Sequence, residues 1–375
     1  MSKSYIKLGE LASYINGYAF KPKDRGSEGL PIIRIQDLTG SSNDKGFYKG
    51  TYPSKIEINN GDVLISWSAS LGVYVWNNGK ALLNQHIFKV VFDKGEIDKD
   101  YFVYAVQFSL HRMRQLTHGA TMKHVVKKDF ENVLIPYPSL KDQRKVAHVL
   151  DKLKESINKK MDELKKLDEL IKARFVEMFG DPVLNSQHYN LVKLSNLGTL
   201  ARGKSKHRPR NDPQLLGGPY PLIQTGEITN SDTFIKKFTN TYSELGLQQS
   251  KLWPKGTLCI TIAANIAQTA ILTFDACFPD SVVGFIPENS DITPLYLHYW
   301  FSFFQKIIDS QASQVAQKNI NLKVLSNLQV MLPPKNKQSE FASFVQQVDK
   351  SKVAVQKSLD ETQKLFDSLM QEYFG

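Results

Sequence analysis

The sequence has very few cysteines and lacks long apolar runs. Only Cys259 and Cys277 occur in the 375 residues, so neither a disulfide framework nor a four-thiolate zinc site is available. The chain begins with polar residues, and no stretch reaches the roughly 18 consecutive apolar residues that a membrane-spanning helix needs. We therefore expect a soluble, cytoplasmic protein that binds no membrane.

Motifs of catalysis are missing as well. An adenine methyltransferase that works alone needs an Asp/Asn-Pro-Pro-aromatic loop for the target amine, and the nearest segments, residues 211–214 and 332–335, lack that set. There is no GxxxxGK(S/T) loop to hold the phosphates of ATP. The histidines do not group with cysteines or carboxylates at zinc-like spacings. We predict a chain without a catalytic centre, cofactor or metal of its own, although missing motifs leave an unfamiliar active site open.

The chain carries an excess of positive charge. Its 48 Lys and Arg residues against 37 Asp and Glu give a net charge of +11. This excess favours a polyanion such as nucleic acid as the partner, although net charge also serves solubility. The composition is that of an ordinary globular chain, and the length allows two or three domains.

The chain is an internal duplication, which fixes its architecture. Three pairs of matched positions mark the repeat: Lys7 and Lys193, Pro31 and Pro221, and Gly61 and Gly256. The offset between the copies is 186 residues at the first pair, 190 at the second and 195 at the third, and it stays at 195 to the end. The second copy has therefore gained residues only in its early part.

Each copy begins with a region of mixed structure, residues 1–138 and 181–333. Short β-like runs such as LPIIRI and TLCITIA alternate with Gly, Pro and Asn turns, which predicts compact α+β domains. Residues 101–108 and 296–304 are rich in aromatic residues at helical spacing. We interpret them as helices that face the core, with base stacking as the alternative.

Each copy ends in a long predicted helix, residues 139–180 and 334–375. Apolar residues recur every seven positions with further ones between them, which is the seam of a coiled coil. The seam residues are Leu150, Leu153, Ile157, Leu164, Leu167, Ile171 and Met178 in the first helix, and Val345, Val348, Val355, Leu359, Phe366, Leu369 and Tyr373 in the second. Lys352 interrupts the second seam.

The predicted fold class is α+β, with two similar α/β-mixed domains separated by two long helices that pack as an antiparallel coiled coil. A helix of roughly 38 residues at about 1.5 Å per residue spans about 57 Å. One turn of B-DNA is about 34 Å, so two domains at opposite ends of such helices would contact one duplex more than a turn apart. This geometry is typical of a protein that measures a split DNA site.

The order of these segments resembles a known family. THGATMKHVVKKDFENVLIPYPSLKDQRKVAHVLDKL, from Thr117, and SQASQVAQKNINLKVLSNLQVMLPPKNKQSEFASFVQQV, from Ser310, are similar to the junction between target-recognition domain and conserved helix in specificity subunits of type I restriction-modification systems. The opening KLGELASYINGYAF is similar to the start of the same recognition domain. The resemblance covers nearly the whole chain. The second copy departs from the first at Gln314, where the first has Gly119.

The resemblance implies target-recognition domains at residues 1–138 and 181–333 and conserved helices at 139–180 and 334–375. Such a subunit recognises a bipartite asymmetric DNA site and recruits two DNA adenine methyltransferase subunits, joined in the full enzyme by two restriction/translocase subunits. S-adenosylmethionine, ATP and Mg²⁺ would belong to those partners. The alternatives are the specificity part of a combined restriction-methylation enzyme, an unrecognised nuclease and a coiled-coil adaptor that binds no DNA.

Residues that contact DNA divide into those that bind phosphates and those that read bases. Basic positions shared by both copies are predicted phosphate contacts: Lys123, Lys128, Lys318 and Lys323. A dense basic run and its weaker counterpart are further candidates: Arg202, Lys204, Lys206, Arg208 and Arg210, and Lys21, Lys23 and Arg25. Polar positions that differ between the copies are candidate base readers: Arg34, Gln36, Ser66, Ser68 and Ser70, and Gln224, Thr225, Asn265 and Gln268. The alternative for every basic group is a solvated surface.

Deleting one heptad from both helices, residues 150–156 and 345–351, should keep the seam in register. At about 1.5 Å per residue each helix shortens by roughly 10 Å, which corresponds to about three base pairs. If the helices set the distance between the readers, methylation mapping should show both half-sequences kept and a shorter nonspecific spacer. Altered half-sequences with an unchanged spacer would contradict this.

Overall fold

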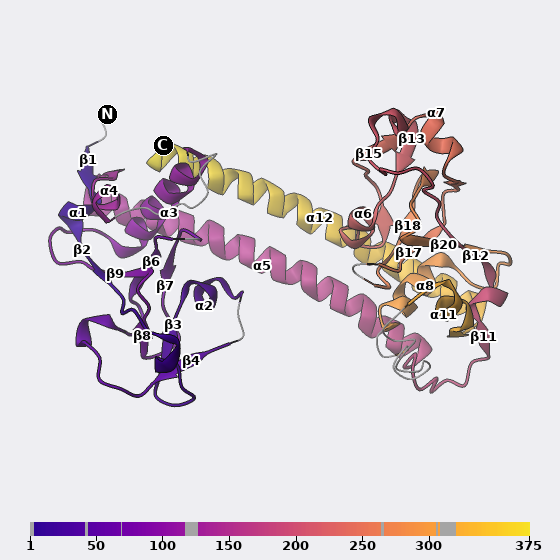
Figure 1. Cartoon of the computed structure of the whole chain (residues 1–375), viewed down its shortest axis with the longest axis horizontal. Helices are drawn as coiled ribbons and strands as arrows, with labels where there is room; N and C mark the ends of the chain where they lie inside the picture. The colour runs from indigo at the N-terminus through magenta and orange to yellow at the C-terminus, as the bar shows by residue number, and fades with distance from the viewer. Residues whose placement is uncertain are drawn as a thin grey trace. The chain divides into compact units, whose positions relative to one another are not determined.

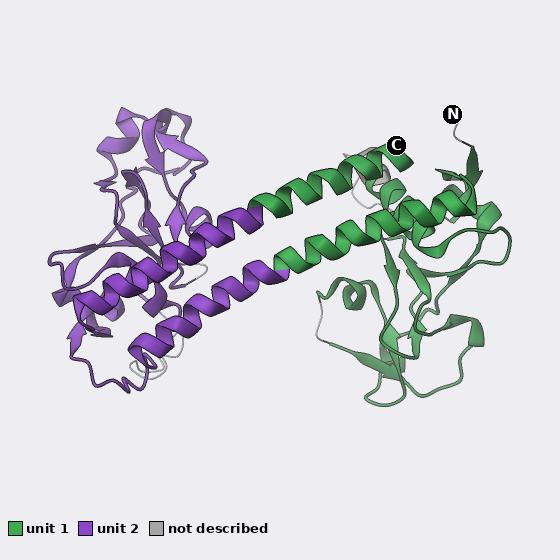
Figure 2. Cartoon of the chain, turned by 180° about the vertical axis from the view of Figure 1, so that it is seen from behind, with its two compact units in different colours: residues 1–161, 357–375 green, residues 162–356 purple. Residues whose placement is uncertain are grey.

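The computed structural model of the chain describes residues 4–41, 44–68, 70–116, 127–263, 266–304, 307 and 320–375. The chain forms two compact units, which Figure 2 shows in different colours. Unit 1 comprises residues 1–161 and 357–375, and unit 2 comprises residues 162–356. The two long helices, α5 (Leu140–Phe179) and α12 (Lys335–Phe374), each contribute one half to either unit.

Unit 1 contains two four-stranded sheets and one short ladder. The first sheet is antiparallel, in the order β2 (Ser13–Asn16), β9 (Ile87–Val91), β6 (Val63–Ser66) and β7 (Gly72–Val75). The second has the order β4 (Gly46–Tyr48), β3 (Leu30–Ile33), β8 (Ala81–Leu83) and β5 (Glu57–Ile58). β3 and β8 are parallel. The ladder joins β1 (Tyr5–Lys7) to β10 (Leu134–Pro136).

Unit 2 repeats this strand order. Its first sheet has the order β12 (Gly198–Arg202), β20 (Val282–Pro287), β17 (Leu258–Thr261), β18 (Thr269–Leu272) and β14 (Phe234–Ile235). Its second has the order β15 (Asn240–Tyr242), β13 (Leu216–Leu222), β19 (Ala276–Cys277) and β16 (Leu252–Trp253). β11 (Leu191–Lys193) pairs with β21 (Gln329–Met331). Among the described strands only β14 lacks a counterpart in unit 1, so the structure repeats as the sequence does.

The helices besides α5 and α12 are short apart from α3 (Lys99–Leu116) and α8 (Pro294–Phe301). In unit 1 the others are α1 (Leu8–Leu11), η1 (Pro22–Asp24), α2 (Ile35–Thr39), η2 (Ser54–Ile56) and α4 (Lys127–Glu131). In unit 2 they are η3 (Leu194–Asn196), η4 (Pro213–Leu215), α6 (Thr225–Thr229), α7 (Glu244–Gln248) and α11 (Leu322–Asn327).

The aromatic-rich helices α3 and α8 face the core, as predicted. Tyr101 and Tyr296 are almost completely buried at matched positions. Tyr101 Oη donates to the carbonyl oxygen of Pro136 at 2.9 Å, and Tyr296 Oη donates to that of Met331 at 3.1 Å. Because each buried hydroxyl finds a backbone acceptor, these rings anchor α3 and α8 on the strand that precedes the long helix. Base stacking by these two rings is therefore wrong.

Ser139 caps the start of α5. The backbone N–H of Asp142 donates to Ser139 Oγ at 3.2 Å, and Ser139 Oγ donates to the Asp142 carboxylate at 2.6 Å. The helix ends before Gly180, whose φ of 77° lies in the left-handed region that favours glycine. Side-chain capping and a glycine stop thus set both ends of α5 from local sequence alone.

The long helices pack antiparallel, as predicted. In unit 1 Leu150, near the start of α5, belongs to the same buried cluster as Phe374, at the end of α12. In unit 2 Phe175, near the end of α5, lies 5.5 Å from Phe341, near the start of α12, between ring centroids. The start of each helix therefore packs with the end of the other, which is the arrangement of an antiparallel coiled coil.

The predicted seam is incomplete at the helix ends. Five large apolar side chains that are fully or almost fully buried were not assigned to it: Phe175, Phe179, Phe341, Met370 and Phe374. The predicted residues near the middle, such as Leu164, Val355 and Leu359, are only partly buried. The reason is that the helix ends pack into the domain cores as well as against each other, which widens the apolar stripe beyond two positions per heptad.

Two compositional expectations concern cysteines and membranes. Cys259 and Cys277 are buried free thiols in β17 and β19, and burial raises the pKa of both, so they are core residues. Within the described part of the chain, every helix is too short or too polar to cross a membrane.

A buried glutamine joins each domain to its long helix. Gln143 Oε1 accepts the backbone N–H of Asp98 at 2.9 Å, and its Nε2 donates to the Pro138 carbonyl oxygen at 2.9 Å. Gln338 makes the matched contacts, accepting from the backbone N–H of Thr293 at 3.0 Å and donating to the carbonyl oxygens of Asp291 and Pro333. Both side chains are 1% exposed. Each glutamine therefore satisfies loop groups that would otherwise be buried without partners.

Gln143→Leu and Gln338→Leu should each lower the free energy of unfolding by about 1–3 kcal/mol, because the substitution leaves buried backbone groups unsatisfied. Denaturant unfolding of the full chain measures the loss. The matched control is Gln346→Leu at an exposed position of α12, which should change stability by less than about 0.5 kcal/mol. Equal effects of all three changes would show that the buried contacts contribute nothing specific.

Candidate nucleic-acid interface

Two short helices at matched positions carry candidate base-reading residues. The backbone N–H of Arg34 donates to Asp37 Oδ2 at 2.9 Å at the start of α2. The backbone N–H of Gln224 donates to Glu227 Oε2 at 3.0 Å at the start of α6. The structure thus places Arg34 and Gln224 at equivalent positions, although the side chains differ. Gln36 on α2 and Gln224 are exposed.

Arg34 is held by acidic neighbours. Its Nε pairs with Asp37 at 3.1 Å, and its guanidinium also donates to the backbone and approaches the carboxylate of Asp44. The hydrogen bond with Asp37 is the main cause that raises the pKa of Arg34, against a smaller opposing effect of burial. Arg25 pairs with the same Asp44 carboxylate at 2.9 Å. Asp44 therefore brings the loop that carries Arg25 beside α2.

The loop before Arg25 presents the other basic residues of this region. Lys21 and Lys23 lie around η1 with exposed side chains. The backbone N–H of Lys21 donates to Asp24 Oδ2 at 2.7 Å, which fixes the turn. Lys21 and Lys23 therefore precede Arg25 on one ordered turn, and Arg25 links this turn to α2 through Asp44.

Two predicted base readers are wrong because they are buried. Ser66 is completely buried at the end of β6, and its Oγ donates to the carbonyl oxygen of Ser70. Ser68 is 6% exposed. In unit 2 the matched Thr261 is also completely buried, and its Oγ1 accepts the backbone N–H of Gln268 at 3.0 Å. These hydroxyls close the turns, and the described candidates Ser70 and Gln268 are exposed beside them.

The arginines of the basic run in unit 2 gather around one carboxylate. Arg202 Nε donates to the carbonyl oxygen of Asp280 at 2.8 Å. The guanidinium groups of Arg208 and Arg210 both pair with the carboxylate of Asp280. The run has no acid of its own, so the fold supplies a counter-charge that the sequence pattern did not reveal. The Asp280 carboxylate orders the loop of residues 202–210 and offsets part of the positive charge of that loop.

The two lysines of the same run are held only through their backbone. Lys206 N–H donates to Gln249 Oε1 at 2.6 Å, and Ser250 Oγ donates to the carbonyl oxygen of Lys204 at 2.9 Å. Both lysine side chains are exposed, and neither pairs with a carboxylate of the described residues. An ordered backbone with exposed ammonium groups is suited to phosphate contact.

The shared lysines lie on matched helices away from the base-reading candidates. Asn132 Nδ2 donates to the carbonyl oxygen of Lys128 at 2.8 Å, and Asn327 Nδ2 donates to that of Lys323 at 2.9 Å. Both lysine side chains are exposed. In unit 1, α4 lies beside α1 and not beside α2 (Figure 1). Three predicted residues lie outside the described residues: Lys123, Asn265 and Lys318.

A cleft of about 1010 Å³ in unit 2 contains residues that sequence reasoning missed. Gln224 and Asn230 line it from α6, Lys236 and Lys237 from the following segment, and Lys352 from α12. The basic run of residues 202–210 does not line it. The sequence gives one signal for this cleft. The offset between the copies rises from 190 to 195 after the second matched pair, which reflects the longer linker after α6.

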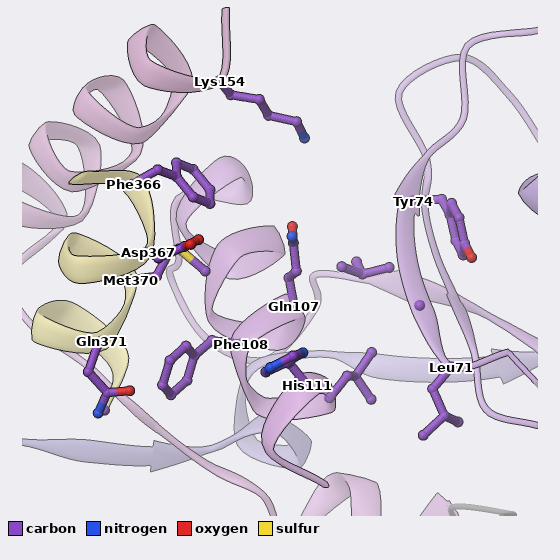
Figure 3. A pocket seen from close by; sticks show the side chains of 14 residues that line it. Leu71, Tyr74, Gln107, Phe108, His111, Lys154, Phe366, Asp367, Met370 and Gln371 are labelled. Carbon is purple, nitrogen blue, oxygen red and sulfur yellow. The ribbon is translucent and has the colours of Figure 1, made fainter. Parts of the chain in front are cut away.

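Unit 1 has a cleft of about 1110 Å³ between β7, α3 and the helix pair. Figure 3 shows Gln107 and His111 on α3, with Lys154 and Phe366 from the long helices around the same space. Polar and apolar side chains alternate along its wall. Leu71 lines the cleft and directly follows Ser70 in the sequence, so the cleft adjoins one of the exposed candidate base readers.

Side chains that could bind a metal ion do not cluster within the described residues. No group of three or more His, Cys, Asp or Glu side chains among them could hold a metal ion. Among the described histidines His298 is the most perturbed, since burial lowers its pKa to about 4. Its Nδ1 lies 2.9 Å from Thr269 Oγ1, so it is a neutral, hydrogen-bonded core residue.

The duplicated fold, the shared helix pair and the exposed basic loops define a class of recognition proteins that carry two DNA-reading domains. A family model for the type I restriction modification DNA specificity domain matches residues 3–167 and 187–362, one match for each copy. The chain therefore belongs to this family. It is a DNA specificity subunit of a type I restriction-modification system, a non-catalytic component.

Similar proteins agree with this family over nearly the full length. The specificity subunit of the type I restriction enzyme EcoBI from Escherichia coli is 24% identical over 98% of this chain and 85% of its own length. The S subunit from M. genitalium superimposes with a TM-score of 0.56 at 16% identity, covering 100% of this chain and 96% of its own. A chain from a structure on complex assembly and conformational transition of the type I R-M system gives 0.60 at 17% identity, covering 99% and 97%. The two structures show that the fold is shared.

Replacing both Lys204 and Lys206 by Ala should weaken specific and nonspecific DNA binding about equally. Each phosphate contact adds about 0.9 to the slope of log affinity against log salt, so the slope should fall by up to about 2. Binding to duplexes over a range of salt concentrations measures it. The control replaces Lys152 and Lys159, which pair with Glu155 on α5, and should keep the slope. Unchanged affinity and slope in the first variant would remove this loop from the interface.

Proposed function

We propose that the two domains read the two halves of a bipartite asymmetric DNA site, one domain for each half. The observation that carries this proposal is the matched pair α2 and α6, in which one backbone arrangement presents different residues: Arg34 and Gln36 in the first copy, where the second has Gln224 and Gly226. Identical frames with different polar side chains are what two different half-sequences require. Gln side chains recognise adenine through paired hydrogen bonds in the major groove.

The proposed base readers are the exposed residues Gln36, Ser70, Gln224 and Gln268, together with the half-buried Thr225. The proposed phosphate contacts are the exposed basic residues: Lys21, Lys23, Lys128, Arg202, Lys204, Lys206, Arg208, Arg210 and Lys323. Phosphate contacts position the domain, whereas base contacts give it sequence preference. Arg25 and Arg34 act mainly through Asp44, with which both pair. They hold the loop after η1 beside α2.

The proposed assembly contains two DNA adenine methyltransferase subunits on this chain, with two restriction/translocase subunits in the full enzyme. S-adenosylmethionine, ATP and Mg²⁺ then belong to those partners, and the complex works in the cytoplasm, where the DNA is. Domains at residues 1–138 and 181–333 and helices at 139–180 and 334–375 are the proposed functional division. The duplication supports this stoichiometry, because two similar copies offer two similar surfaces.

Gln36→Ala should relax sequence preference in the first half-site and leave the second unchanged, and Gln224→Ala should do the reverse. A good paired contact to a base discriminates by about 1–3 kcal/mol, so the preference should fall by roughly fivefold or more. The measurement is methylation of a library with randomised half-sites by the complex reconstituted with its methyltransferase subunits.

The control for both variants is Gln346→Ala, at an exposed position of α12 outside the proposed readers. It should leave both half-sites as they are. Equal loss of preference in both halves with either glutamine variant would argue against one domain for each half. Methylation by the purified chain alone would favour the combined restriction-methylation enzyme instead.

A further inference from the structure

A lysine occupies a seam position of α12. Lys352 stands where the first copy has Ile157, which is 195 residues earlier and 9% exposed. The side chain of Lys352 is only 11% exposed. A lysine at such a position weakens the apolar seam unless its charge is paired. We therefore expect Lys352 to make a specific contact with an acidic group.

Two carboxylates of unit 2 pair with this lysine. Lys352 Nζ lies 2.7 Å from Asp168 Oδ1 on α5 and 2.8 Å from Asp232 Oδ2 in the segment after α6. Burial by itself would lower the pKa of Lys352, but the hydrogen bonds to the two carboxylates outweigh it and the net effect raises the pKa. Lys352 therefore stays charged and joins three separate segments: α5, α12 and the segment after α6.

The segment that carries Asp232 is particular to the second copy. Ten residues, 230–239, separate α6 from β15, whereas six residues, 40–45, separate α2 from β4. The longer segment forms β14 and passes beside α12. The extra length thus brings Asp232 to Lys352, and the first copy, with Ile157 in the seam, has no lysine at the matched position for such a contact.

The residue after Asp232 is fixed to the domain core. Thr233 Oγ1 lies 3.0 Å from Tyr299 Oη, and burial raises the pKa of Tyr299 to about 12. The backbone N–H of Ile271 donates to the carbonyl oxygen of Thr233 at 2.9 Å. Asp232 is therefore the point at which this anchored segment turns toward the helix pair.

Lys352 and Gln224 line the same cleft of unit 2. We infer that Lys352 is a positioning residue for recognition of the second half-site: through Asp232 it holds the segment after α6 against α12, and so fixes the orientation in which α6 presents Gln224 to DNA. This inference rests on the proposed function, in which α6 reads bases. Asp168 neutralises the remaining charge and holds the lysine in the seam.

Lys352→Ile tests the inference, because it restores the residue type of the first copy and keeps the seam apolar. In the reconstituted complex it should relax discrimination in the second half-site by roughly three- to tenfold and leave the first unchanged. Asp232→Asn should act in the same direction, since it removes the same contact from the other side. The chain's thermal unfolding midpoint should stay near or above that of the wild type, because isoleucine keeps the seam apolar and the two carboxylates left behind are 53% and 77% exposed, so neither becomes a buried unpaired charge.

Three further variants serve as controls in the same assay. Lys352→Arg keeps the charge that pairs with both carboxylates and should retain more discrimination than Lys352→Ile. Asp168→Asn leaves the Asp232 contact in place and should change the second half-site by less than about twofold. Lys350→Ile makes the same chemical change at an exposed neighbouring position of α12 and should have no effect on either half-site.

The outcomes separate the inference from the proposed function. If Gln224→Ala changes the second half-site while Lys352→Ile and Asp232→Asn do not, Lys352 has no positioning role and the proposed function stands. If none of the three variants changes it, α6 is not a reader and both ideas fail. If Lys352→Ile weakens both half-sites together with thermal stability, the lysine has only a structural role and the inference is overturned.

Discussion

The rest of the structure depends on one constraint: each domain core is completed by side chains from both long helices. Leu150 of α5 and Phe374 of α12 enter the core of unit 1, and Phe175 of α5 and Phe341 of α12 enter the core of unit 2. Apolar burial is roughly proportional to the area removed from water and has no preferred direction. The helix ends therefore contribute to domain stability and to helix pairing at the same time, and neither can change without the other.

Duplication has kept the contacts that fix the backbone. Tyr101 and Tyr296 donate to matched carbonyl oxygens, and Gln143 and Gln338 bind the loop before the aromatic helix in the same way. Such buried polar contacts are expensive to break, because a lost partner leaves a group without a hydrogen bond in a low-dielectric core. A frame held in this way leaves exposed polar side chains free to differ between the copies.

Acidic side chains decide what the basic surface offers. Asp44 holds Arg25 and Arg34 in unit 1, and Asp280 gathers the arginines of the basic run in unit 2. Arg is suited to this because its planar guanidinium binds a carboxylate through several donors, whereas the neighbouring exposed lysines such as Lys204 are compact point charges. The paired arginines therefore order the loops, and the exposed lysines add positive charge that no carboxylate of the described residues offsets.

The sequence by itself determined the duplication, the two long helices with their ends, the antiparallel pairing and the family, because repeats, heptads and caps such as Ser139 are patterns of residues near one another along the chain. It also predicted that aromatic residues of α3 and α8 are core residues. Only the tertiary structure decided that Ser66 is buried, that Asp280 serves the basic run and that Lys352 pairs with Asp232. Burial and ion pairing depend on which distant segments fold against a side chain, and no local spacing encodes that.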